Sequence, residues 1–345
     1  MTRIVTARPL FLLLGFLLLL VVWLSLALGP VSLPLGDTLR ALAHMLGLPV
    51  SADGLGQAEL IVGQIRLPRT LLGIATGGVL ALAGVAMQGL FRNPLADPGL
   101  IGVSSGAALG AAIAIVFGAS IGGLPEAFAP YLLSACAFAG GLSVTALVYR
   151  LGRHNGQTSV ATMLLAGIAL TALAGALIGL FTYLADDATL RTLTFWNLGS
   201  LNGASYPRLW PLLLITLLVA CWLPRRVNAL NALLLGESEA RHLGFDVERL
   251  KLELILCTAL GVGAAVAAAG MIGFIGLVVP HLLRLIVGPD HRVLLPASMF
   301  GGAILLLLAD LIARLALAPA ELPIGIVTAL IGAPFFLYLL IRGRS

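Results

Sequence analysis

Arginines near apolar runs are the residues of this chain best suited to recognition chemistry. Arg66 and Arg69 stand three positions apart, across Leu67 and Pro68, where an apolar run begins. Guanidinium groups pair with carboxylates, so two arginines at this spacing predict a directed positive patch for an acidic partner. The alternative is ordinary interfacial anchoring, in which a long side chain extends its charged end toward water.

Arg191 offers a second kind of recognition chemistry, because Phe195 and Trp196 follow it at the fourth and fifth positions. A guanidinium matches the geometry of a carboxylate, and an aromatic ring packs on a flat apolar surface. The group therefore suits a flat ligand that carries carboxylates. The alternative is an interfacial arginine with neighbouring aromatics, which is common at the level of the lipid headgroups.

Residues for enzymatic chemistry are missing from the sequence. The only lysine, Lys251, stands in Leu250-Lys251-Leu252, whereas a phosphate-binding loop requires Gly-Lys-Ser/Thr. No Gly-x-Ser-x-Gly elbow occurs in a strand-turn-helix context, and no His-x-x-x-His pair occurs. We predict that the chain is not an enzyme, has no catalytic residues, and binds no metal or cofactor of its own.

The elements that position these residues must lie in a membrane. Of 345 residues, 60% are hydrophobic and 10% are charged, and such a chain cannot bury its apolar surface in one soluble core. The net charge of +5 comes almost entirely from arginine and includes no basic block interleaved with aromatics. This balance indicates anchoring at a membrane surface and argues against nucleic-acid binding.

Hydropathy predicts an all-α, polytopic protein with about ten transmembrane helices in a single transmembrane domain, residues 1–345. The first apolar run has about 19 residues, which exceeds a signal-peptide core and approaches the length of a span. With both termini in the cytoplasm, 14 of the 20 basic residues lie on the cytoplasmic side, which supports a multi-pass protein of the cytoplasmic (inner) membrane in this orientation. The predicted spans are Leu10–Leu28, Thr70–Leu90, Leu100–Phe117, Ala127–Tyr149, Val160–Leu184, Leu209–Leu223, Leu252–Ala268, Ile272–Ile286, Leu294–Ala318 and Ile324–Ile341.

Small residues repeat at helical spacing in several spans. Such repeats let helix backbones approach closely where lipid supplies no hydrophobic drive, so they predict helix packing. They occur at Gly73/Gly77, Gly102/Gly106/Gly110 and Gly175/Gly179.

The loop between the sixth and seventh spans carries charges of both signs. Gly236 and Gly244 bracket a short amphipathic piece suited to a groove on another protein. The alternative is a solvated loop helix.

Ionisable groups are rare at membrane depth, which weighs against a secondary transporter driven by protons or sodium. A lone charge at mid-span costs roughly 2.5–3.5 kcal/mol, so a proton relay would leave visible carboxylates in the spans. Asp310 is the clear exception, and it precedes Arg314 by four residues, which predicts a mutually neutralising pair. A passive channel has less support, because no selectivity ring is evident.

The stretch from Arg66 to Gly110 resembles the permeases that import iron siderophores, heme and cobalamin using ATP. Three further blocks follow in the order of that family, namely Leu235–Gly244, Gly270–Arg284 and Asp310–Pro334. The resemblance implies the type II ABC importer permease fold and a pathway between two copies of the chain. It also implies two separate ATPase subunits, which bind ATP and Mg, and a periplasmic or extracytoplasmic substrate-binding protein.

The same resemblance implies roles for individual residues. The arginines that dock the binding protein would be Arg66, Arg69 and Arg314. The cytoplasmic gate would be formed by Asn93 and Leu95 in one loop and, less closely matched, by Thr158 and Ser159 in another. Coupling helices at about residues 231–249 would contact the ATPase through Gly236, Glu237, Glu239, Ala240, Arg241 and Gly244.

The segment from Asp186 to Leu201 looks most like the heme-importing branch of that family. Siderophore permeases share its Trp-x-x-Gly-Ser-Leu end, so heme is the predicted cargo, with ferric siderophores and then cobalamin as alternatives. Arg191 and Trp196 are the residues expected to line the substrate pathway.

Overall fold

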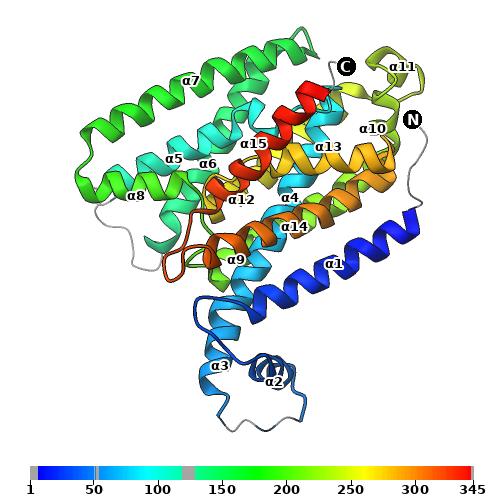
Figure 1. The fold of residues 1–345 in the computed structure, drawn as a ribbon. Helices are drawn as coiled ribbons and strands as arrows, with labels where there is room; N and C mark the ends of the chain where they lie inside the picture. The colour runs from blue at the N-terminus through cyan, green and yellow to red at the C-terminus, as the bar shows by residue number, and fades with distance from the viewer. Residues whose placement is uncertain (1–6, 50, 52–53, 119–128, 343–345) are drawn as a thin grey trace.

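The predicted apolar segments form one bundle of helices. The computed structural model describes residues 7–49, 51, 54–118 and 129–342 (Figure 1). In this part of the chain, seven helices are long and apolar enough to cross a membrane, and three shorter apolar helices complete the set. The all-α architecture with about ten spans is confirmed. The apolar helices are α1 (Ala7–Ala27), α4 (Leu67–Leu90), α5 (Val103–Phe117), α6 (Ala129–Gly152), α7 (Val160–Leu184), α9 (Tyr206–Trp222), α12 (Val247–Ala269), α13 (Ile275–Val287), α14 (His291–Leu315) and α15 (Ile324–Arg342).

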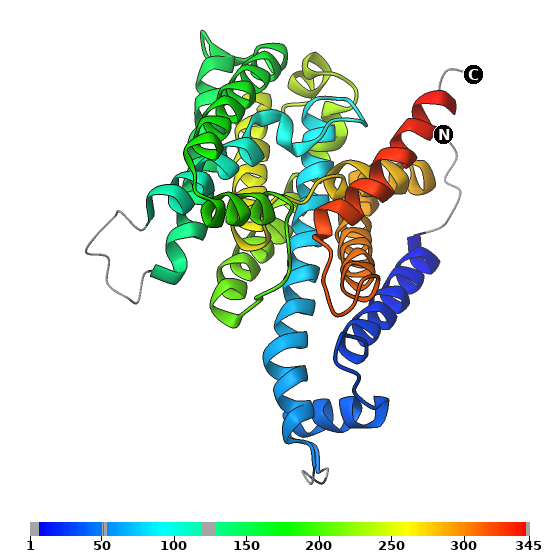
Figure 2. The same ribbon diagram turned by 60° about the vertical axis from the view of Figure 1, so that its left-hand side comes forward.

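Helix α4 is the centre of the bundle and runs through its full height (Figure 2). It packs against α9, α12, α13 and α14. Small residues make this possible, because a Cβ atom at Gly84 would overlap the carbonyl oxygen of Gly276 on α13. By contrast, a Cβ atom at Gly175 or Gly179 on α7 would meet no atom of another described segment within 4 Å. The predicted small-residue packing therefore holds for α4 but is not used by α7 within one chain.

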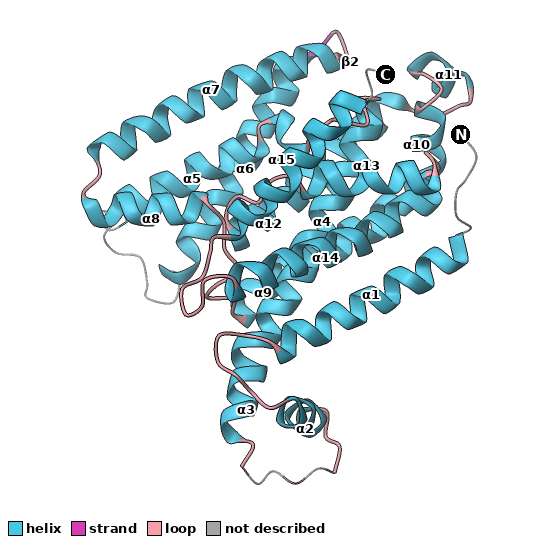
Figure 3. Cartoon of the chain, viewed as in Figure 1, coloured by secondary structure: helices cyan, strands magenta, loops and turns pink. Residues whose placement is uncertain are grey.

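The bundle has two ends, named here after the helices that mark them. The α2 end carries α2 (Leu35–Met45) and α3 (Gly56–Leu60), which lie beside the start of α4 (Figure 1). The α11 end carries α10 (Val227–Leu233), α11 (Glu237–His242) and a two-stranded hairpin (Figure 3). Both ends of the described chain also lie at the α11 end (Figure 1).

Two predicted boundaries are corrected by local backbone structure. The second span begins well before Thr70, because α3, the π-helix η1 (Ile61–Arg66) and α4 form one continuous helix over Gly56–Leu90. The third span begins at Val103 instead of Leu100. Residues Pro98–Ile101 form a separate 3₁₀ turn, η2, and Gly102 at φ 78° breaks the path into α5.

The hairpin joins α6 to α7 and was not predicted. Strand β1 (Arg153–His154) pairs antiparallel with β2 (Gln157–Thr158), with Arg153 opposite Thr158. The two turn residues, Asn155 and Gly156, have φ of 50° and 80°. Positive φ at both positions is the mark of a type I′ turn, for which Asn-Gly is a favoured pair.

Candidate functional site

Arg191 and its neighbouring aromatics share an open cavity at the α2 end. They lie on α8 (Asp187–Asn197), a short helix between α7 and α9. The cavity has a volume of about 840 Å³, within the range of about 300–1,000 Å³ that is typical of small-molecule sites. Its lining includes Arg191, Phe195, Trp196 and Glu321. The two predicted pathway residues, Arg191 and Trp196, are therefore neighbours on one wall.

Helix α8 is held firmly at both ends. At its start, the Asp186 side chain accepts a hydrogen bond from the Thr189 backbone N–H at 2.8 Å. Hydrogen bonds from the Thr189 side chain and backbone hold the pKa of the Asp186 carboxyl below its usual value. Beyond its end, the backbone of Gly199 accepts from Ile324 N–H at 3.1 Å, which ties the loop to the start of α15. The cavity wall is thus anchored to the bundle.

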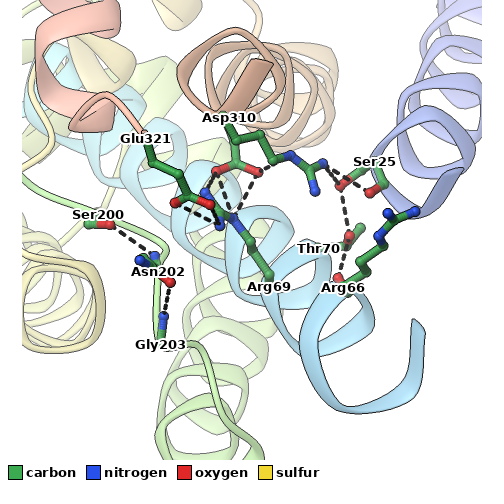
Figure 4. Close-up of polar contacts among 10 residues, drawn as sticks. Ser25, Arg66, Arg69, Thr70, Ser200, Asn202, Gly203, Asp310 and Glu321 are labelled. Carbon is green, nitrogen blue, oxygen red and sulfur yellow. Dashed lines mark hydrogen bonds and ion pairs between the residues drawn. The ribbon is translucent and has the colours of Figure 1, made fainter. Parts of the chain in front are cut away.

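The far wall of the cavity carries a carboxylate that belongs to a buried ionic network. Glu321, in the loop between α14 and α15, accepts hydrogen bonds from Arg69 Nη1 at 2.9 and 3.0 Å (Figure 4). Its side chain is 23% exposed, whereas that of Arg69 is 8% exposed. One end of the network therefore reaches the cavity, and the other lies inside the bundle.

Asp310 is the centre of this network. Its carboxylate accepts from Arg69 Nε and Nη2 at 3.0 and 2.8 Å and lies 3.4 Å from Arg314 Nε (Figure 4). Arg314 also donates to the backbone and side chain of Ser25 on α1, both at 2.9 Å. The predicted neutralising pair of Asp310 and Arg314 is present. We call Arg69, Asp310, Arg314 and Glu321 the α4–α14 charge cluster.

Arg66 has a different structural role, because it caps the end of α1. Its Nη1 donates to the carbonyls of Leu26 and Ala27 at 2.8 and 2.6 Å, and its Nη2 donates to Val31. Carbonyls in the last turn of a helix lack partners within that helix, and a cation there also interacts favourably with the helix dipole. Arg66 thus fastens α1 to the start of α4.

The three arginines of the predicted positive patch are buried in the single chain. Arg66, Arg69 and Arg314 are 3%, 7% and 2% exposed, and each has its partners inside the bundle. Burial of a guanidinium requires compensating hydrogen bonds, and these contacts supply them. The structure brings Arg69 and Arg314 together around Asp310, but it does not present the three as exposed donors. Their role in docking a binding protein stays a prediction.

The four predicted gate residues lie in two loops. In the first loop Asn93 is exposed, and its side chain accepts from Leu95 N–H at 2.9 Å, so the residue shapes its own turn. In the second, Thr158 ends the hairpin and is 4% exposed. Ser159 is the N-cap of α7, where its side chain accepts from Thr162 N–H at 3.3 Å. The gating role of all four is untested.

The predicted coupling segment forms the short helix α11. Gly236 and Gly244 bracket it with φ of 137° and 87°, a region that favours glycine. Ala240 is fully buried, whereas Glu239 and Arg241 are exposed. This small helix therefore packs on the bundle through one face and presents charged side chains on the other.

Several residues that tie these parts together were not predicted. Ser25 and Glu321 come from segments remote in sequence from their arginine partners, and no spacing indicates either one. Glu248 and Lys251 on α12 bond to the hairpin and to α11. Lys251 could have been singled out from the sequence, because an ionisable residue in an apolar segment is a candidate functional residue.

Known proteins resemble this chain over nearly its whole length. Residues 17–342 match the FecCD transport family. The hemin transport system permease HmuU of Yersinia pestis is 46% identical over 338 residues, covering 97% of this chain and 96% of that protein. The vitamin B12 import permease BtuC of Klebsiella pneumoniae is 44% identical over 332 residues, covering 96% and 93%.

A solved structure agrees with this match. It is described as an inward-facing conformation of a metal-chelate type ABC transporter, and it superposes with a TM-score of 0.84 at 35% identity. The superposition covers 98% of this chain and 100% of the other. The chain therefore belongs to the FecCD transport family and is the membrane permease of a metal-chelate type ABC importer.

Proposed function

We propose that this permease carries heme across the cytoplasmic membrane. The observation that supports the proposal is the cavity in which Arg191 lies on the same wall as Phe195 and Trp196. Heme has two propionates and a flat apolar macrocycle. A guanidinium pairs with a propionate through two charge-assisted hydrogen bonds, and an aromatic ring packs on the macrocycle.

Sequence identity alone does not choose the cargo. The hemin permease is 46% identical and the vitamin B12 permease 44% identical to this chain, a difference too small to separate two substrates. The residues that line the cavity favour heme. A corrin bears amides in place of most carboxylates, so it offers fewer groups that a guanidinium could bind at this position. Ferric siderophores and cobalamin remain the alternative cargoes.

We propose a homodimer as the transporting unit. Only 11% of the most apolar part of α7 is buried in the single chain, and a Cβ atom at Gly175 or Gly179 would meet no other described segment within 4 Å. Small residues on an uncovered helix suit close packing against a second copy across the pathway. Two separate ATPase subunits would then dock on the two α11 helices, and an extracytoplasmic binding protein would deliver the cargo at the α2 end.

The proposed orientation places the α11 end in the cytoplasm. Arg153 of the hairpin, Arg241 of α11 and Arg292 at the start of α14 lie toward this end, as the positive-inside tendency requires. Both termini would then be cytoplasmic. The cavity with Arg191 would open toward the outside, where a binding protein releases its cargo.

The decisive experiment compares cargoes in the complete reconstituted transporter. Vesicles containing the permease, its ATPase and its binding protein are supplied with hemin, several ferric siderophores or vitamin B12 in parallel. Uptake of hemin above the other cargoes, dependent on ATP, is expected. Preferential uptake of a siderophore or of vitamin B12 would overturn the heme assignment. Uptake by the permease alone under an ion gradient would overturn ATP-driven import itself.

Substitutions at Arg191 test the role of the cavity. Arg191→Ala should lower hemin uptake about tenfold or more, because a hydrogen bond to a charged group contributes roughly 1.5–3 kcal/mol. Arg191→Lys should restore only part of the rate, since a lysine lacks the bidentate fork. The matched control is Arg40→Ala, which removes an exposed arginine that pairs with Asp37 on α2, outside the cavity. Equal hemin uptake by Arg191→Ala and Arg40→Ala would leave Arg191 as a membrane anchor.

A further inference from the structure

The single lysine of the chain lies buried where three segments meet. Lys251 on α12 is 1% exposed. Its Nζ donates to the Thr158 carbonyl at 2.9 Å, to Glu237 on α11 at 2.8 Å and to Glu248 at 3.2 Å. An ammonium has three N–H donors, so each is matched to one acceptor. The hairpin, α11 and α12 therefore share one charged group.

Glu248 completes the contact with the hairpin. Its Oε2 accepts from the Thr158 backbone N–H at 2.8 Å, while Lys251 binds the carbonyl of the same residue. Arg241 of α11 lies 3.3 Å from Glu248 and 3.7 Å from Glu237. We call Glu237, Arg241, Glu248 and Lys251 the lysine cluster. It holds the main chain of Thr158 on both sides, so the contact does not depend on the Thr158 side chain.

The hairpin in turn leads into α7. Thr158 is followed by Ser159, the N-cap of α7, and α7 passes at its other end into α8, which carries Arg191. A displacement of α11 that pulls on Lys251 would therefore move the first turn of α7. Lys251 is buried, and loss of a partner from a buried charge is strongly destabilising, so the charged group holds the three segments together.

We propose that the lysine cluster is the link that transmits movement of α11 to the hairpin and α7. The proposal rests on the proposed function in one respect, namely that α11 docks on the ATPase. Lys251 and Glu237 act in it as positioning residues, because they touch the hairpin or α11 and not the cargo. The competing explanation is local neutralisation of two carboxylates, without any effect on movement.

Hydrogen exchange tests the link without any cargo. In the complex of the permease with its ATPase, deuterium uptake over residues 153–159 is measured with and without a non-hydrolysable ATP analogue. The wild type should change its uptake there when the analogue binds. Glu237→Gln removes the charge of the α11 carboxylate that binds Lys251, and it should reduce that change although Arg241 still contacts Glu248. Asp37→Asn is the control, and it should keep the change because Asp37 is an exposed carboxylate on α2, outside the cluster and at the other end of the bundle.

Lys251 variants extend the test to transport. Lys251→Met keeps the apolar stem, and we expect hemin imported per ATP hydrolysed to fall about tenfold, within the usual 5–150-fold range of coupling between sites. Lys251→Arg should retain part of the coupling. If Lys251→Met does not fold, the double variant Lys251→Met/Glu237→Gln replaces it, because the remaining pair of Arg241 and Glu248 keeps the cluster neutral. Arg292→Met removes an exposed cation on α14, away from the cluster, and should leave the ratio unchanged.

The outcomes separate the link from the proposed function. If Glu237→Gln responds to the ATP analogue as the wild type does, or if Lys251→Met imports hemin with wild-type coupling, the link is refuted while import stands. If wild-type vesicles do not import hemin, the proposed function fails. The exchange comparison still decides the link in that case, because it requires only the permease and its ATPase.

Discussion

Asp310 should be the residue whose loss most destabilises the bundle. It is fully buried on α14 and forms ion pairs with two cations, Arg69 on α4 and Arg314 one turn further along its own helix. The perturbation is Asp310→Ala. It removes the only carboxylate that contacts both arginines among the described residues, and it leaves both guanidinium groups inside the bundle.

The size of the effect follows from what each arginine retains. Arg69 keeps Glu321, whose side chain is 23% exposed, whereas Arg314 keeps only the Ser25 oxygens as its hydrogen-bond acceptors in the described chain. Breaking a buried pair by removing one partner costs about 3–5 kcal/mol, because an uncompensated charge stays behind. Glu321→Gln removes a partly exposed partner from Arg69 and should cost only about 1 kcal/mol.

Chemical denaturation of the purified permease in detergent micelles measures both changes. A shift of the midpoint at constant slope reports a change in the free energy of unfolding. The control is Asp37→Asn, which breaks the exposed pair with Arg40 at 3.7 Å and should shift the midpoint little. The double variant Asp310→Ala/Arg314→Leu should lose less than the sum of its single variants, since it removes an orphaned cation as well.

A loss below about 1 kcal/mol for Asp310→Ala would refute this reasoning, because it would mean that the buried arginines find other compensation.

The same logic explains why charge reversal at Arg69 is a poor test of docking. Arg69→Glu would place three carboxylates together within the α4–α14 charge cluster. Any lost binding would then reflect a damaged bundle.

Two further predictions concern helix contact and docking. Gly84→Ala should lower the free energy of unfolding by about 1–3 kcal/mol through overpacking against Gly276. Gly15→Ala on α1, where an added methyl group meets open space, should change that free energy by no more than about 0.5 kcal/mol. Equal denaturation midpoints would contradict the close contact of α4 and α13. Glu321→Gln should speed association with an acidic binding protein, most at low ionic strength, because it removes one of the two carboxylates that neutralise Arg69. Surface plasmon resonance at two salt concentrations measures this rate, and an unchanged salt dependence would exclude Arg69 from docking.

Hydropathy predicted the spans because each depends on local composition. A helix in lipid satisfies its backbone hydrogen bonds within the segment, so about 20 apolar residues predict a span without knowledge of its neighbours. The end of α7 at Leu184 and the start of α15 at Ile324 agree with the predicted spans, because one apolar run ends and another begins at these residues. Boundaries set by special turns were missed, as at Gly102, because backbone conformation there departs from the helix without a break in hydropathy.

The pairing of Asp310 with Arg314 was also predictable, because i,i+4 spacing on one helix is a local property. The sequence by itself likewise determined the membrane class, the absence of a phosphate-binding loop and the presence of Arg191 beside two aromatics. What only the tertiary structure decided is which remote groups meet. Arg69 meets Glu321 across more than 250 positions, and Lys251 meets Thr158 across more than 90. A buried guanidinium or ammonium must have hydrogen-bond acceptors, because burial of an unpaired charge is costly. The packing of whole helices decides which acceptors lie within reach.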